Sequence, residues 1–394
     1  MCYNNLHSFT IDRQEGRAVI DNQLATSQHR FAFKLFAELT KSTSEKNVFI
    51  SPASVALALT MAYNGARGET ERAIARTLEL GEIDLDALNR ANAALIESLR
   101  ALDPQVVLAI ANSLWAKQGM TFDPAFLRRN REFYGAEVAT LDFGDARAAA
   151  AINDWVVRNT NGKIDKIVDR IDPSAIMFLI NAIYFKGNWA KQFDPRRTRE
   201  MPFTLSGGQQ KPHPMMAQTG KFEHYATQGF QAISLPYGAG RASMYIFLPE
   251  QRSSLRAFRR ELSNKSWDTW LRHFRQAEGT IVLPRFKLAY EATLNDALKA
   301  LGMGIAFDRR RADFGRMVAD GKPSANIDEV KHKTFVEINE EGTEAAAVTS
   351  IGMIRMTMAP QRNFSMIVDR PFFCAIRDNQ TGMLLFMGAI VDPE

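Results

Sequence analysis

Histidine and cysteine supply much of the catalytic and metal-binding chemistry of proteins, and this chain of 394 residues contains few of either. Its six histidines are His7, His29, His213, His224, His273 and His332. None lies in an HExxH motif, and neither a CxxC pair, a Walker loop nor a GxSxG elbow is present. The sequence therefore offers no catalytic motif, and we expect that the protein is not an enzyme.

The histidines also give no metal-binding pattern. His213 and His224 lie in one segment, "HPMMAQTGKFEHY", without a carboxylate at a spacing that suits a metal. His332 begins a strand pattern with apolar neighbours, and a buried imidazole there needs hydrogen-bond partners. We expect a structural role for His332, and we expect neither a metal nor a cofactor.

The two cysteines, Cys2 and Cys374, are too few for a disulfide scaffold, so we expect no bridge. The first residues, "MCYNNLHSF", lack the apolar core of a signal peptide, and no apolar run reaches the length of a membrane span. We expect an extracellular or cell-surface protein from which a signal has been removed. An intracellular location stays open as the alternative.

The charge of the chain is basic but dispersed, with a net charge of +5 at pH 7. Arginines cluster at 128–131 and at 309–311, and neither cluster is interleaved with aromatic residues along one face. This pattern argues against nucleic acid binding and favours solvated surface. An anionic polysaccharide or a membrane surface remains an alternative partner.

Helical patterns dominate the first part of the chain and strand patterns the rest. Apolar residues recur at Phe31, Leu35, Phe36 and Leu39, as on one face of a helix. Further on, "AIMFLINAIYFKGNW" is a long apolar run typical of a central strand, and "KTFVEINEEG" alternates at period two. We predict an α+β fold, and since no linker composition divides the chain, one domain over residues 1–394.

A run of small residues follows the last of these strands. In "GTEAAAVTS" one face of an extended chain would carry Thr343, Ala345, Ala347 and Thr349, which are small and uncharged. Such a segment could enter a sheet as an added strand without forcing the core apart. A disordered Ala/Thr-rich linker is the alternative that composition leaves open.

Five segments resemble signatures of the serpin family, in the family's order, between about Phe31 and Pro393. They are "NVFISPASVALALTMAYNGARGETERAIARTL", "NAIYFKGNWAKQF", "LPRFKLAYEATLNDALKALGM", "VKHKTFVEINEEGTEAAA" and "DRPFFCAIRDNQTGMLLFMGAIVDP". The resemblance implies the serpin fold, with three β-sheets, eight to nine helices and an exposed reactive-centre loop. It implies a hinge and loop at 340–363, and we expect residues 1–22 to be a flexible extension.

The resemblance also implies a function, the suicide-substrate inhibition of serine proteases. A target protease attacks the loop, forms an acyl-enzyme, and is trapped when the cleaved loop enters the main sheet. Cysteine proteases are a further class of target, and we expect the inhibitor to be a monomer. A non-inhibitory serpin that acts as a carrier or chaperone is the alternative.

The family's hinge maps onto a defined set of residues: Glu340, Glu341, Gly342, Thr343, Glu344, Ala345, Ala346, Ala347 and Val348. The fourteenth residue after Gly342 is Met356, so the resemblance places the scissile bond between Met356 and Thr357. A hinge shorter by one residue would place the bond between Arg355 and Met356. Met356 suits elastase-, chymotrypsin- or subtilisin-like proteases, whereas Arg355 suits a trypsin-like pocket that contains a carboxylate.

The last implied site is a polar cluster that controls the opening of the main sheet. Ser51, Ser54, Asn181 and His332 match it, and Trp189 matches the residue where insertion begins. Hydroxyls, an amide and an imidazole can join strands and then separate without leaving a buried charge. Ordinary core packing is the alternative role for each of them.

Overall fold

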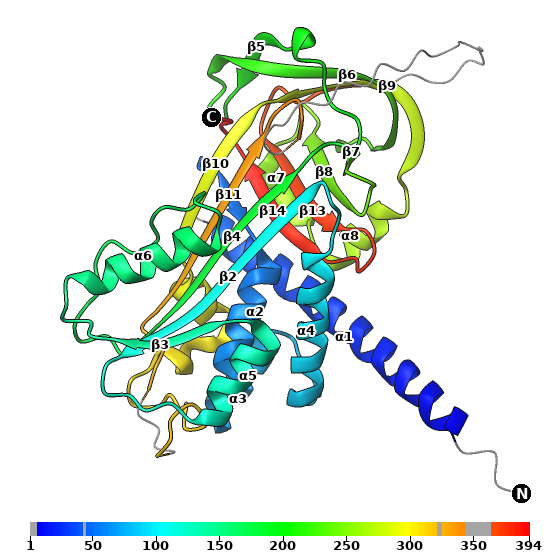
Figure 1. The fold of residues 1–394 in the computed structure, drawn as a ribbon. Helices are drawn as coiled ribbons and strands as arrows, with labels where there is room; N and C mark the ends of the chain where they lie inside the picture. The colour runs from blue at the N-terminus through cyan, green and yellow to red at the C-terminus, as the bar shows by residue number, and fades with distance from the viewer. Residues whose placement is uncertain (1–5, 42–44, 321–324, 343–363) are drawn as a thin grey trace, which may run out of the picture.

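The fold is given by a computed structural model that describes residues 6–41, 45–320, 325–342 and 364–394, with side chains from Gln23 onward. Its α-helices are α1 (Leu6–Thr40), α2 (Pro52–Tyr63), α3 (Gly68–Thr77), α4 (Leu85–Arg100), α5 (Pro124–Tyr134), α6 (Arg147–Asn159), α7 (Leu255–Glu261), α8 (Asn264–Leu271) and α9 (Asn295–Leu298). Its strands are β1 (Val48–Ile50), β2 (Val106–Lys117), β3 (Glu137–Leu141), β4 (Met177–Gly187), β5 (Arg199–Thr204), β6 (Gln210–Ala226), β7 (Phe230–Tyr237), β8 (Ala242–Pro249), β9 (Arg275–Pro284), β10 (Phe286–Thr293), β11 (Glu329–Ile338), β12 (Phe364–Ile367), β13 (Phe372–Asp378) and β14 (Leu384–Ile390). The predicted α+β class is confirmed (Figure 1).

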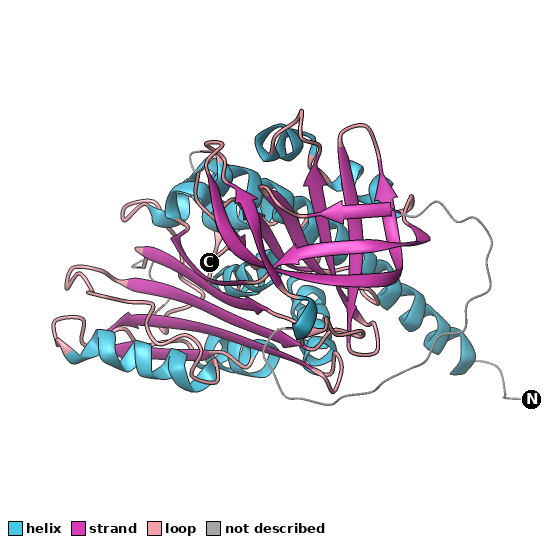
Figure 2. Cartoon of the chain, turned by 90° about the horizontal axis from the view of Figure 1, so that it is seen from above, coloured by secondary structure: helices cyan, strands magenta, loops and turns pink. Residues whose placement is uncertain are grey.

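The strands of the described residues hydrogen-bond into two sheets, of five and nine strands. The five-stranded sheet has the order β10-β11-β4-β2-β3, and β11 pairs with β4 in parallel at its centre. In the nine-stranded sheet, β6 pairs with β5 through its first six residues and with β7 through its last four. Because one long strand joins these two groups, two of the three sheets implied by the resemblance form one continuous hydrogen-bonded path (Figure 2).

Helices cover both faces of the five-stranded sheet, which explains why its central strand is apolar throughout. On one face α6 packs through Trp155. Its ring contacts that of Trp115 in β2 edge to face, with the ring centroids 6.0 Å apart. On the other face lies α2, whose twelve residues are all buried. Figure 1 shows α6 in front of the sheet and α2 behind it. In β4 ten of eleven residues are buried, as expected for a strand that is covered on both sides.

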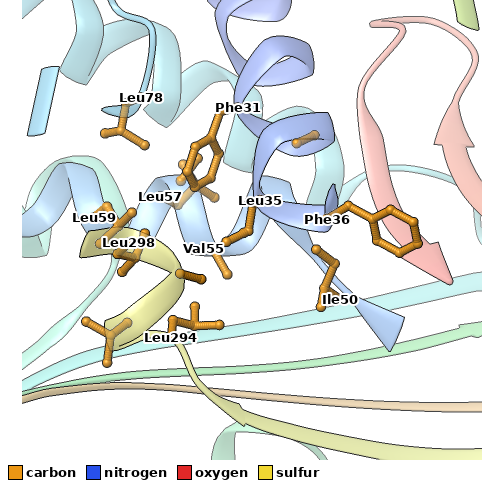
Figure 3. Close-up of a cluster of buried hydrophobic side chains, with 14 of the residues drawn as sticks. Phe31, Leu35, Phe36, Ile50, Val55, Leu57, Leu59, Leu78, Leu294 and Leu298 are labelled. Carbon is orange, nitrogen blue, oxygen red and sulfur yellow. The ribbon is translucent and has the colours of Figure 1, made fainter. Parts of the chain in front are cut away.

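The helical face predicted near the start of the chain is the face that α1 buries. Phe31, Leu35 and Phe36 are each no more than 1% exposed. Figure 3 shows Phe31 and Leu35 among apolar side chains of α2 and α9, and Phe36 on the side of Ile50 of β1. Each such side chain contributes about 1.5–3 kcal/mol by leaving water, so this cluster fixes the position of α2 behind the sheet.

No helix in the part of the chain that the structure describes is long and apolar enough to cross a membrane.

Candidate functional site

The N-terminus of α2 meets the five-stranded sheet at a buried polar cluster. Ser51 is the N-cap of this helix, and its hydroxyl accepts a hydrogen bond from the N–H of Ser54 at 3.3 Å. Pro52 follows at the first helical position, where its missing N–H costs nothing. The backbone N–H of Ser51 turns to the sheet and donates to Nε2 of His332 at 3.0 Å.

The sheet side of this cluster is a row of three polar residues on neighbouring strands. Asn112 of β2, Asn181 of β4 and His332 of β11 are register partners, one beside the next. The Asn181 amide group donates to Oδ1 of Asn112 and to Oγ of Ser54, both at 2.5 Å. Its own Oδ1 lies 2.5 Å from Nδ1 of His332. The row thus ties three strands to one another and to α2.

The four residues predicted to form this cluster, Ser51, Ser54, Asn181 and His332, do come together and are all buried. Sequence reasoning missed Asn112, although a polar residue within the apolar run "VVLAIANSLWAK" was a usable signal. We call these five residues the gate cluster, after the role that the resemblance implies for four of them.

The imidazole of His332 is neutral in this cluster. Its Nε2 accepts the bond from Ser51, so Nδ1 carries the proton and donates to Asn181. Burial lowers the pKa of His332 to about 3, because a charged ring would lose its hydration, and the bond to Asn181 opposes this only partly. The gate cluster can therefore separate without leaving a buried charge.

Directly around the gate cluster, β4 and β11 are neighbours with no strand between them. Their parallel pairing runs from Phe178 opposite Glu329 to Tyr184 opposite Phe335. Beyond this point β11 continues to Ile338 and β4 to Gly187 without further register pairs between them. A strand inserted here would have to break the pairs that the gate cluster spans.

Trp189 lies apart from the gate cluster, just beyond the end of β4. Its ring stacks on Tyr237 with centroids 4.4 Å apart. Its indole N–H donates to the carbonyl of Asn339 at 2.9 Å, and its backbone N–H donates to that of Glu341 at 2.8 Å. The structure therefore places Trp189 against the first hinge residues rather than against His332.

Gly342, the third hinge residue, lies at a junction that only glycine can occupy. Gly342 has a φ of +133°, which strains any L-residue, and a Cβ there would lie 2.1 Å from the carbonyl oxygen of Gly187. It forms an antiparallel bridge with Asn188. The start of the hinge is thus fixed against the end of β4.

Glu340 is held at the same junction by both its backbone and its side chain. Its carbonyl accepts from the N–H of Phe193 at 2.8 Å. One carboxylate oxygen accepts from the hydroxyl of Thr198 at 2.6 Å, and the other lies 3.5 Å from Nε of Arg285. The remaining hinge residues, Thr343–Val348, and the candidate bait residues Arg355, Met356 and Thr357 lie outside the described residues.

On the far side of that segment the chain is fixed again at β12. Phe364 is the register partner of Gly279 in β9. Its ring packs so closely on this glycine that a Cβ there would lie only 2.3 Å from the nearest ring carbon. The ring also stacks on the imidazole of His224 with centroids 4.0 Å apart. Residues 343–363 are therefore flanked by two anchored ends.

Among the described residues, no group of three or more His, Cys, Asp or Glu side chains is placed to hold a metal ion. His213 and His224 serve packing and hydrogen bonding instead: Nε2 of His213 meets the carbonyl of Arg285, and His224 stacks as stated above. Cys374 is a free, buried thiol, and burial raises its pKa.

The sequence is similar to a known family over almost its whole length. The family model described as Serpin (serine protease inhibitor) matches residues 26–393. Serpin B8 of Bos taurus is 34% identical, over 94% of this chain and 99% of that protein. The leukocyte elastase inhibitor of Homo sapiens is 33% identical, over 94% of this chain and all of that protein.

Solved structures share the fold. The native state of the thermophilic serpin tengpin superimposes with a TM-score of 0.85 at 30% identity, covering 93% of each chain. Human thyroxine-binding globulin complexed with its ligand superimposes with a TM-score of 0.87 at 27% identity, covering 95% of this chain and 99% of that one.

Proposed function

This chain belongs to the serpin family, and we propose that it inhibits serine proteases as a suicide substrate. The observation that carries the proposal is a pair of features that meet at Gly342. A hinge of small residues, Thr343–Val348, follows this glycine in the sequence. Beside it, β4 and β11 pair directly with each other, and their C-terminal ends have no register pairs between them. The small residues of the hinge are compatible with a strand, and the hinge follows Gly342, which lies beside the end of β4.

In the proposed reaction the protease serine attacks the carbonyl carbon of Met356. A bond forms between its Oγ and that carbon, the peptide bond to Thr357 breaks, and the amine of Thr357 leaves with the proton. The chain that ends at Met356 is then an ester of the protease. Its hinge enters between β4 and β11, carries the protease along, and stalls deacylation.

The inhibitor's own residues assist the insertion of the hinge into the sheet, whereas the protease alone cleaves the peptide bond. The gate cluster opens at no charge penalty, because His332 is neutral and its partners are amides and hydroxyls. The junction of Gly342 with Asn188 and Trp189 sets where insertion starts. Backbone pairing with both neighbouring strands is the gain that drives it.

The target class follows from the bait residue. Met356 favours proteases with a medium-sized apolar pocket, of the elastase, chymotrypsin or subtilisin type. The similarity to the leukocyte elastase inhibitor supports this class. Arg355 as bait would direct the inhibitor to trypsin-like proteases instead, and cysteine proteases are a secondary class.

A carrier function is the second candidate, and the similarity to thyroxine-binding globulin supports it. The hinge favours inhibition, because the inward positions Thr343, Ala345 and Ala347 hold no bulky, charged or proline residue. We also propose that the chain acts as a monomer folded as one domain. The relatives give no support to the predicted extracellular location, and we do not propose it.

A protease panel tests the proposed function. The full chain is incubated with elastase-, chymotrypsin-, subtilisin- and trypsin-like enzymes, and the products are separated on a denaturing gel. We expect a band that survives denaturation, at the sum of the protease mass and 44.2 kDa less the released C-terminal peptide. Cleavage by every enzyme without such a band would contradict inhibition and favour the carrier.

A further inference from the structure

The connection between β4 and β5, with the first residue of β5, carries a basic surface, which we call the basic loop (residues 191–199). It contains Lys191, Arg196, Arg197 and Arg199, all exposed. Asp194 is its one carboxylate, and the exposed Glu200 follows directly after it. Arg196 pairs with Asp194, with Nε and Oδ1 3.1 Å apart, and this pairing lowers the pKa of Asp194. In the described part of the chain, no carboxylate lies within ion-pair distance of the other three cations.

We call residues 343–363 the reactive segment, and the chain just before and just after it the first and second flank. The basic loop contacts the first flank. The N–H of Phe193 donates to the carbonyl of Glu340, and the hydroxyl of Thr198 donates to the carboxylate of Glu340. Both donors belong to the same short stretch of chain that holds the cations. The loop is therefore directly beside the residue two positions before Gly342.

It also reaches toward the second flank. Nζ of Lys191 donates to the carbonyl of Thr219 at 2.9 Å, and the guanidinium of Arg197 donates to the hydroxyl of Thr219 at 3.3 Å. Across the sheet, that hydroxyl lies 3.0 Å from that of Thr280 in β9. The register partner of Thr280 in β12 is Ser365.

A protease bound to the reactive segment must therefore lie close to the basic loop. Met356 is eight residues before Phe364, so even a fully extended chain holds it within about 28 Å of that anchor. This distance is less than the diameter of a protease domain of ordinary size, about 40 Å. A protease bound at Met356 is then near enough to contact the surface between the two flanks.

We propose that the basic loop is a second contact surface for the target protease, and that it selects proteases with an acidic surface beside the active-site cleft. This inference rests on the proposed function and adds a property of the partner that the bait residue does not determine. Exposed, unpaired cations beside a binding site raise the rate of association with an acidic partner, and salt screens the effect.

Two other partners fit the basic loop less well. Its cations are not interleaved with exposed aromatic side chains, which single-stranded nucleic acid would need for stacking. In the described residues, the large hydrophobics exposed most are Val107 and Ile367, and neither is in the loop, so membrane insertion has no apolar anchor there. A sulfated polysaccharide is the occupant that the experiment must separate from a protease.

The experiment compares two triple charge reversals in the full chain. The first replaces Lys191, Arg197 and Arg199 by Glu. The matched control replaces Arg128, Arg129 and Arg131 of α5 by Glu, which changes the net charge equally at the opposite end of the molecule (Figure 1). The rate constant for formation of the denaturation-resistant complex is measured with the protease found in the panel, from low to high ionic strength.

We expect the basic-loop variant to associate about tenfold more slowly than the wild type at low salt, with the gap closing as salt rises. The yield of complex at the end of the reaction should stay unchanged, because the hinge is intact. The α5 variant should stay close to the wild type. The single neutral variant Arg197→Gln should show a smaller loss in the same direction, and so guards against a folding defect in the triple variant.

Three outcomes would overturn the inference. Equal rates and equal salt dependence for wild type and basic-loop variant would show that the loop makes no contribution to association. A variant that inhibits normally but no longer binds a sulfated-polysaccharide resin would assign the loop to that ligand. Failure of the wild type to form a complex with any protease would instead refute the proposed function, and this inference with it.

Discussion

His332 and Asn181 lie directly opposite each other in the parallel pair of β11 and β4, with Nδ1 of the histidine 2.5 Å from Oδ1 of the asparagine. This single contact joins the two strands that the proposed mechanism must separate. It is made by a neutral imidazole and an amide, so the two strands are joined by hydrogen bonds that can break without exposing a charge to the core.

The neutrality of His332 predicts a loss of stability in acid. The folded protein holds this pKa near 3, below the ordinary value of 6.5 that applies to the unfolded chain. Between these values the unfolded chain binds a proton that the folded protein excludes, so stability is complete above about pH 6.5 and falls as the pH is lowered toward 3. The slope for one such group is about 1.4 kcal/mol per pH unit.

The measurement is urea unfolding of the wild type and His332→Gln across that pH range. We expect the wild type to lose stability more steeply than the variant. Burial also lowers the pKa of His29, His213 and His224, so the difference between the two proteins isolates His332. Parallel slopes would mean that the imidazole is protonated in the folded state or that it is hydrated.

Gly342→Ala should damage the junction at the start of the hinge. Alanine at a φ of +133° is strained, and its Cβ would overlap the carbonyl of Gly187. We expect a loss of at least about 2 kcal/mol in the free energy of unfolding, or local detachment of the hinge from Trp189 seen as a change in its fluorescence. Gly207→Ala is the control, since a Cβ there meets open space; equal effects of both changes would refute the prediction.

Thr343→Arg should convert the inhibitor into a substrate while leaving the fold intact. In the alternation of an extended chain Thr343 faces inward, and an arginine that enters the sheet carries a charge into an apolar interior, at a cost of several kcal/mol. Glu344→Arg places the same side chain on the outward face and should preserve inhibition. Gel densitometry of complex against cleaved inhibitor decides the matter, and a stable complex with the Thr343 variant would count against insertion.

The position of the scissile bond predicts the mass of one peptide. If Met356 is the bait, the target protease releases a C-terminal fragment that begins with Thr357. A fragment that begins with Met356 would move the bait to Arg355. Mass spectrometry of the reaction mixture distinguishes the two, because the fragments differ by one methionine.

Oxidation gives an independent test of the same bait residue. Methionine sulfoxide is polar and should bind poorly in an apolar pocket, so mild oxidation should slow inhibition. Replacing Met356 by Leu should keep inhibition and remove this sensitivity. Continued sensitivity in the Leu variant would assign the effect to another methionine.

Local periodicity predicted an element correctly where the whole segment belongs to one helix or one sheet. The spacing of Phe31, Leu35 and Phe36 predicted the face that α1 buries. In contrast, "GTIVLPRFKLAYE" reads as one alternating strand but forms two. β9 ends at Pro284 and pairs with β6, whereas β10 begins at Phe286 and pairs with β11. The buried positions change parity at the break, from Ile281 and Leu283 in β9 to Phe286 and Leu288 in β10. Pro284 at the end of β9 was a usable sign of this break.

The gate cluster could not have come from local patterns. Ser51 and His332 are separated by 281 residues, and only the family resemblance placed them together. Asn112 escaped even so, because no signature segment quoted for the resemblance contains it. Trp189 lies apart from the gate cluster because it follows the end of β4. The position of that end depends on tertiary packing and cannot be read from local sequence patterns.

The two anchored flanks, Gly342 and Phe364, have a consequence for how much inhibitor a cell or fluid must hold. While the chain is intact, both ends of the segment are tied, so residues 343–356 cannot lie fully within the sheet unless β12 leaves β9. Cutting the segment frees one end and cannot be undone by the protein. On the proposed function, each molecule is spent in a single encounter, and protection against a protease is a question of dose rather than of affinity.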